Sequence, residues 1–100
     1  MDIEDWRRRI DGIDDQIVAL LNERARCALT IGRIKRGADV AVHDPERERR
    51  VLEHVAAVTN DGPLSGEAVQ RVFASIIDES CRLEREQNEA ATLAGRPTES

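Results

Sequence analysis

The feature that most constrains the fold is a long apolar seam in the first third of the chain. Between Ile3 and Ile34, side chains spaced alternately three and four residues apart are apolar at nine of ten positions. The seam comprises Ile3, Trp6, Ile10, Ile13, Ile17, Leu20, Arg24, Cys27, Ile31 and Ile34. This repeat is typical of a helix that packs against another helix along its length. It predicts one helix from about residue 3 to about residue 36.

The length of this helix predicts a dimer. At 1.5 Å per residue it would be roughly 50 Å long, whereas a compact domain of this size has a radius of gyration of only ~13 Å. The rest of the chain is too short to cover the whole seam. We therefore expect the long helices of two chains to cover each other.

Capping signals predict two further helices. Asp44 is expected to cap a second helix, with Pro45 in its first position. This helix is expected to bury Val51, Leu52, Val55 and Val58 and to end at a break over residues 59–63. Ser65 is expected to cap a third helix with Val69, Val72, Phe73, Ile76, Ile77 and Leu83 on one side. The sequence thus predicts an all-α domain over residues 1–90, and a disordered tail over residues 91–100.

Composition excludes several classes of function. The net charge is −5 and only Trp6 and Phe73 are aromatic, which argues against nucleic-acid binding. No stretch reaches the ~20 apolar residues of a membrane span. The acidic N-terminus is unlike a signal peptide, and two unpaired cysteines fit a reduced cytoplasmic location. We expect a cytoplasmic protein.

Motifs for covalent or metal chemistry are also missing. Cys27 and Cys81 are far apart in the sequence, and neither His43 nor His54 has a nearby cysteine, so no metal site is predicted. There is no Gly-rich phosphate loop and no Ser-His-Asp set. An enzyme of this composition would need chemistry that runs without metal or cofactor.

Polar residues interrupt the apolar faces at a few positions. Arg24 lies in the seam, where a guanidinium is costly unless it meets an acid or an anionic ligand. Lys35 lies about three turns further on the same face. On the third helix, Ser80 and Glu84 prolong the row of Phe73 and Ile77. Electrostatic binding of an anion is one interpretation; a register-fixing ion pair and a solvated helix end are the alternatives.

Five motifs in order resemble the all-helical (AroQ-class) chorismate mutases over about four-fifths of the chain. They are Arg7-x-x-Ile10-Asp11-x-Ile13-Asp14, Leu20-Leu21-x-Glu23-Arg24, Ile31-Gly32-x-x-Lys35, Asp44-Pro45-x-Arg47-Glu48 and Ile76-Ile77-x-x-Ser80. The resemblance implies three helices per chain, entwined as a homodimer with two active sites. It also implies rearrangement of chorismate to prephenate, a cofactor-free step toward Phe and Tyr.

The resemblance also implies roles for eight residues. Arg24, with Arg7 of the other chain, would bind the substrate carboxylates, and Lys35 would hydrogen-bond the ether oxygen and a carboxylate. Glu48 would accept from the ring hydroxyl, Ser80 would contact a carboxylate, and Asp44 and Arg47 would line the site. Glu84 would stand on the other side of the ether oxygen. The family usually has Gln there, which puts the working pH and the substrate in doubt.

Other functions remain open on this fold. An isochorismate pyruvate-lyase has a similar cationic site, and a mutase of an amino-substituted chorismate is a further alternative. A non-catalytic helical dimerisation or regulatory module is the alternative outside enzymes. Because the family is often fused to other shikimate-pathway enzymes, such an enzyme is also a conceivable partner.

Overall fold

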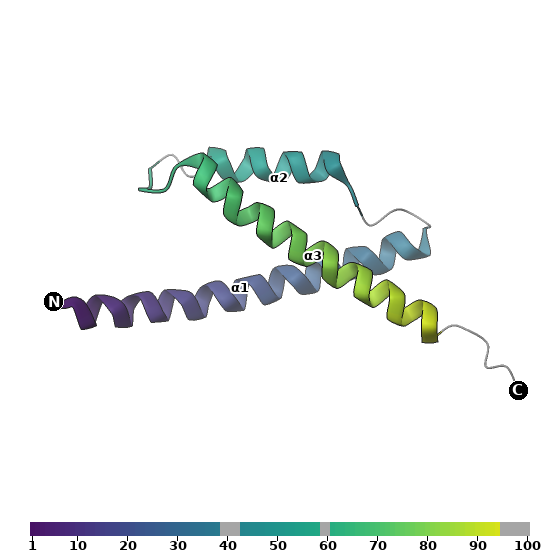
Figure 1. Ribbon diagram of the computed structural model, residues 1–100, viewed down its shortest axis with the longest axis horizontal. Helices are drawn as coiled ribbons and strands as arrows, with labels where there is room; N and C mark the ends of the chain where they lie inside the picture. The colour runs from purple at the N-terminus through teal and green to yellow at the C-terminus, as the bar shows by residue number, and fades with distance from the viewer. Residues whose placement is uncertain (39–42, 59–60, 95–100) are drawn as a thin grey trace, which may run out of the picture.

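The chain folds into three helices joined by two short connections (Figure 1). They are α1 (Ile3–Gly37), α2 (Pro45–Ala57) and α3 (Gly66–Ala94) in a computed structural model that describes residues 1–38, 43–58 and 61–94. The predicted all-α fold with a long N-terminal helix is confirmed. The chain measures 68 × 30 × 16 Å with a radius of gyration of 18.1 Å, well above the ~13 Å of a compact domain of this size.

Side-chain caps set the helix starts as predicted. The Asp44 carboxylate accepts a 3.1 Å hydrogen bond from the backbone N–H of Arg47, and the Ser65 hydroxyl accepts a 3.0 Å bond from the N–H of Ala68. At α1, Asp2 and Asp5 form a reciprocal capping box. These bonds satisfy backbone donors that a helix start leaves unpaired.

Helix α3 packs against both other helices. Its first half runs beside α2, and it then crosses the C-terminal half of α1 (Figure 1). The Gln70 amide donates a 3.0 Å hydrogen bond to the Leu52 carbonyl of α2. Beyond the crossing, Arg36 of α1 donates to the Asn88 side chain at 3.0 Å. The packing therefore fixes the C-terminal part of α1 and leaves its N-terminal part projecting.

The hydrophobic core within one chain is small. Among the described residues, only Val55 and Ile77 are buried hydrophobic side chains. Two predicted core positions are wrong: Val58 is 66% exposed and Val72 is 57% exposed. Val58 follows the last residue of α2, and the exposure of Val72 shows that the described part of the chain leaves this position of α3 largely uncovered.

Helix α3 continues to Ala94, four residues past residue 90, where the sequence predicts the end of the helical domain. Ala90 and Ala91 are strong helix formers, and the Thr92 hydroxyl donates to the carbonyl of Asn88 at 2.9 Å within the same helix. The remainder of the predicted tail, residues 95–100, lies outside the described residues.

The apolar seam of α1 is exposed over most of its length. Ile3, Leu20 and Ile34 are all more than 60% exposed, and Gly32, at the α3 crossing, is the one buried residue of α1. A single chain therefore does not cover this seam. In the described parts of the chain, we find no helix with the length and apolarity needed to cross a membrane.

Candidate functional site

A pocket of about 210 Å³ lies between α1, α3 and the start of α2. Seven of the eight predicted site residues line it, and they come from all three helices and from the α2 cap. They are Arg24, Lys35, Asp44, Arg47, Glu48, Ser80 and Glu84. Residues up to 60 positions apart in the sequence, Arg24 and Glu84, are thus brought together around one cavity.

Arg24 reaches across the α1–α3 crossing. Its Nη1 atom donates a 3.1 Å hydrogen bond to the Ser80 hydroxyl. A hydroxyl is a neutral acceptor, so this bond orients the guanidinium without neutralising its charge. The arrangement suits an anionic ligand better than a structural ion pair.

Glu84 is the one buried charged or polar side chain in the described parts of the chain, with 7% exposure. Its Oε2 atom accepts no hydrogen bond from any described residue. Burial raises the pKa of the Glu84 carboxyl above its ordinary value, and the nearby Lys35 ammonium opposes that shift. The side chain thus carries an unpaired polar atom at the wall of the pocket, which is costly unless a ligand or a proton satisfies it.

Gly32 makes room for this carboxylate. A Cβ atom at position 32 would stand 3.2 Å from Cγ of Glu84. The absence of a side chain at Gly32 therefore lets Glu84 lie against α1, beneath the pocket.

The start of α2 brings the neighbouring residues His43 and Glu48 together with Cys81 of α3. Glu48 Oε1 lies 3.2 Å from Nδ1 of His43 and 3.8 Å from Sγ of Cys81. Burial, followed by the carboxylates of Glu48 and Glu84, raises the pKa of the Cys81 thiol. The sequence shows no cysteine near His43. Cys81 becomes its neighbour only through the fold, which packs α3 against the start of α2.

Sequence reasoning also missed several pocket-lining residues. Six mainly apolar side chains complete the wall of the pocket: Cys27, Ala28, Ile31, Val51, Ile77 and Cys81. Cys81 lies next to Ser80 and three residues before Glu84, so the helical period could have placed it on the same face.

Arg7 does not reach the pocket of its own chain. It forms an exposed 2.8 Å ion pair with Glu4, one turn away, and lies about 25 Å from Arg24 along the axis of α1. A role for Arg7 in the site therefore requires a second chain.

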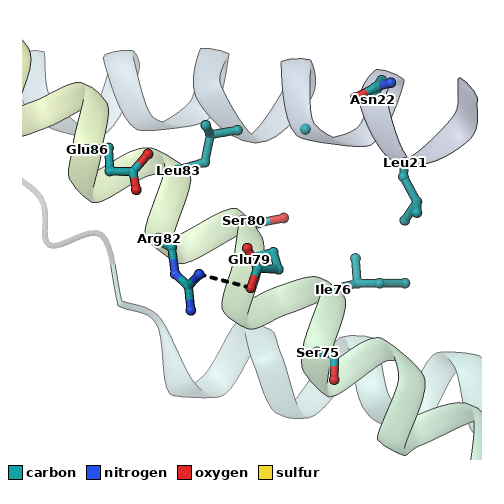
Figure 2. A pocket seen from close by; sticks show the side chains of 10 residues that line it. Leu21, Asn22, Ser75, Ile76, Glu79, Ser80, Arg82, Leu83 and Glu86 are labelled. Carbon is teal, nitrogen blue, oxygen red and sulfur yellow. Dashed lines mark ion pairs between the residues drawn. The ribbon is translucent and has the colours of Figure 1, made fainter. Parts of the chain in front are cut away.

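A second, wider cavity of about 540 Å³ opens on the other side of the crossing (Figure 2). Leu21, Ile76 and Leu83 contribute apolar surface to it, while Arg82 and Glu79 form a 3.4 Å ion pair at its edge. Helix α1 contributes Leu21, Asn22 and Ala25 to this cavity.

Comparison with known proteins gives a consistent result. The family profile described as chorismate mutase type II matches residues 6–85. A chorismate mutase structure from Thermus thermophilus is 33% identical, with a TM-score of 0.81, covering 85% of this chain and 96% of that one. A structure of the Helicobacter pylori chorismate mutase in complex with prephenate is 25% identical, with a TM-score of 0.78, covering 87% and 93%.

Longer relatives match as well. The bifunctional chorismate mutase/prephenate dehydratase of Aquifex aeolicus is 37% identical over 87 residues, which is 84% of this chain and 24% of that protein. The chain therefore spans about a quarter of the length of such relatives. Because the family profile matches most of the chain and a structural relative that is covered almost completely shares its fold, the chain belongs to the type II (AroQ) chorismate mutase family.

Proposed function

We propose that the chain converts chorismate to prephenate. The observation that carries this proposal is the convergence of seven predicted site residues on one pocket. Family membership and the likeness to a chorismate mutase described with prephenate support it. The reaction is an intramolecular rearrangement, so it needs a shaped and charged cavity, and no nucleophile.

The cationic side of the pocket binds the substrate and stabilises its transition state. Chorismate carries two carboxylates, and a guanidinium binds a carboxylate through two parallel hydrogen bonds. Arg24, held by Ser80, takes one carboxylate. Lys35 donates to the ether oxygen, on which negative charge builds as the C–O bond breaks.

The acidic side orients the substrate ring. Glu48, at the pocket wall, accepts a hydrogen bond from the ring hydroxyl. Asp44 holds the first turn of α2 through its cap bond, which keeps Arg47 and Glu48 at the pocket.

The protonated carboxyl of Glu84 donates a hydrogen bond to the ether oxygen from the side opposite Lys35. Only the protonated carboxyl can donate, and burial favours that form. This assigns a use to the buried oxygen that has no hydrogen-bond partner among the described residues.

The active form is a homodimer in which each site receives Arg7 from the partner chain. The exposed seam of α1 and the adjoining 540 Å³ cavity supply the apolar surface for a second copy. Arg7 and Arg24 of one chain are about 25 Å apart along α1 (~1.5 Å per residue). If two α1 helices pack in opposite directions, Arg7 of one chain comes close to the pocket of the other.

A direct assay tests the activity. Purified protein is offered chorismate and, separately, isochorismate, and the products are identified by chromatography. Prephenate from chorismate supports the proposal. Salicylate plus pyruvate from isochorismate, with chorismate unchanged, would assign the lyase reaction instead, and loss of neither substrate would indicate a non-catalytic module.

Mixing two inactive variants tests the shared site. Arg7→Ala and Arg24→Ala should each reduce activity by about 10²–10³-fold, as expected for loss of a buried charged contact. A mixed dimer places both defects in one site and leaves the other intact, so subunit exchange should restore activity. Proven exchange without recovery would show that Arg7 serves no partner site.

A further inference from the structure

Three different metal-binding side chains meet at the start of α2. His43 precedes the Asp44 cap, Glu48 lies in the first turn of α2, and Cys81 comes from the middle of α3. Their donor atoms, Nδ1, a carboxylate oxygen and Sγ, all lie within 4.8 Å of one another. Imidazole, carboxylate and thiolate together are ligands of zinc-like cations.

We propose that His43, Glu48 and Cys81 form a binding site for one divalent cation of the zinc class. Ligand bonds of about 2.0 Å to nitrogen and oxygen and about 2.3 Å to sulfur, in a tetrahedron, separate nitrogen from oxygen by about 3.3 Å and oxygen from sulfur by about 3.5 Å. The observed separations are 3.2 Å for His43–Glu48 and 3.8 Å for Glu48–Cys81. Both agree with the edges of that tetrahedron.

Charge and access fit a bound cation. Binding displaces the Cys81 proton to solvent, so one thiolate and one carboxylate neutralise the two positive charges of the ion. The His43 side chain is 58% exposed and offers a path from solvent, while Glu48 and Cys81 line the substrate pocket. Three protein ligands leave one tetrahedral position for water, at the edge of the pocket.

The site would make the cation an inhibitor of the enzyme. This step rests on the proposed function, in which Glu48 accepts from the ring hydroxyl of chorismate. A cation held by Glu48 withdraws electron density from that carboxylate, which weakens it as an acceptor, and it places the ion and its water at the edge of the substrate pocket. Cation and substrate should therefore compete.

Cobalt(II) titration of the metal-free protein tests the site without using activity. A tetrahedral thiolate complex produces visible d–d bands and a near-ultraviolet sulfur-to-cobalt charge-transfer band, which we expect to saturate at one ion per chain and to disappear when Zn²⁺ is added. Cys81→Ser should lose the charge-transfer band, and His43→Ala should weaken binding by at least about 10-fold.

Two matched variants control for unspecific binding. Cys27→Ser removes the other thiol at the pocket, and His54→Ala removes an exposed histidine of α2; both should retain the cobalt spectrum. A charge-transfer band that survives in Cys81→Ser, or that is lost in Cys27→Ser, would overturn the site, as would the absence of any band in a folded wild-type protein.

The inhibitory step has its own readout. Zn²⁺ should raise the KM for chorismate in the wild type. The His43→Ala variant should need a higher Zn²⁺ concentration for the same relative rise over its own KM without Zn²⁺. The expected cobalt spectrum without inhibition would establish the cation site and overturn the inhibitory step.

Discussion

The two halves of α1 have the same apolar period and very different surroundings. Residues 24–37 cross α3, contain the buried Gly32, and contribute Arg24 and Lys35 to the pocket. The N-terminal half projects away from α2 and α3 (Figure 1), and its seam residues Ile13 and Ile17 remain close to half exposed. The C-terminal half thus lies at a pocket of its own chain, although Ile31 and Ile34 of its seam remain 49% and 67% exposed. In the proposed dimer, a second chain would cover the exposed seam of both halves.

This contrast teaches how periodicity should be interpreted. A regular apolar stripe predicts that something covers the helix, but it does not say whether the cover is the same chain. The position of polar residues within the stripe is more informative, since Arg24 and Lys35 both lie in the half that contributes to a cavity.

The largest expected effect comes from placing a charge on the projecting half. Ile17→Asp should bury a carboxylate in the dimer interface and weaken association by at least about 10³-fold, equivalent to ~4 kcal/mol. Activity should fall with it, because each site would lose the partner chain. Sedimentation at micromolar concentration measures the assembly. Val58→Asp, at an equally apolar but off-seam position, should leave the assembly intact; a dimeric Ile17→Asp protein would contradict the proposed interface.

The next effect concerns the half that forms the pocket. Lys35→Ala should lower kcat by about 10²–10³-fold, as for loss of one oxyanion-hole donor, while KM changes far less because charge on the ether oxygen builds in the transition state. Steady-state kinetics separates the two parameters. A raised KM with unchanged kcat would limit Lys35 to substrate binding.

Glu84 should give this pocket a pH signature. Because its pKa is raised in the folded chain, the folded state retains a proton that the unfolded state has released above the ordinary Glu pKa of about 4.3. The free energy of unfolding attributable to Glu84 therefore decreases as pH rises from there through the raised pKa. Activity should decrease over the corresponding range in the substrate complex.

Glu84→Gln separates this explanation from others. The amide can donate at every pH, so the variant should retain activity and lose the alkaline decline in both kcat and thermal midpoint. Glu84→Ala should be slow at all pH values. Two results together would remove Glu84 from the mechanism: a wild-type rate that is constant from about pH 5 to 8, above the ordinary Glu pKa, and a slow Glu84→Gln variant.

The smallest effect contrasts two glycines of α1. Gly32→Ala should displace Glu84, which a Cβ would approach at 3.2 Å, and lower kcat by about 3–10-fold through misplacement of a catalytic group. Gly12→Ala, on the side of α1 away from the seam, meets no atom of the chain within 4 Å. It should raise stability by up to ~1 kcal/mol without changing kcat. Equal kcat values for the two variants would contradict the role of Gly32.

The helices, and the gathering of seven residues around one pocket, were predictable because their signals are local or match family motifs. Asp44 and Ser65 act on neighbouring backbone groups, so their caps can be identified from the sequence. Val58 and Val72 could not be placed, since their exposure depends on where α2 ends and on which side of α3 its neighbours lie. The His43–Glu48–Cys81 cluster could not be found either, because Cys81 comes from α3, more than 30 positions after His43 and Glu48 at the start of α2.

The small core has a consequence for how the protein becomes functional. Val55 and Ile77 are the only buried hydrophobic side chains among the described residues, so the apolar burial available to a solitary chain is slight. In the proposed homodimer, folding would therefore be coupled to the encounter of two chains. Acquisition of the native state is then second order in chain concentration. Doubling the rate of synthesis should more than double the early yield of working enzyme, and the thermal midpoint should rise with protein concentration.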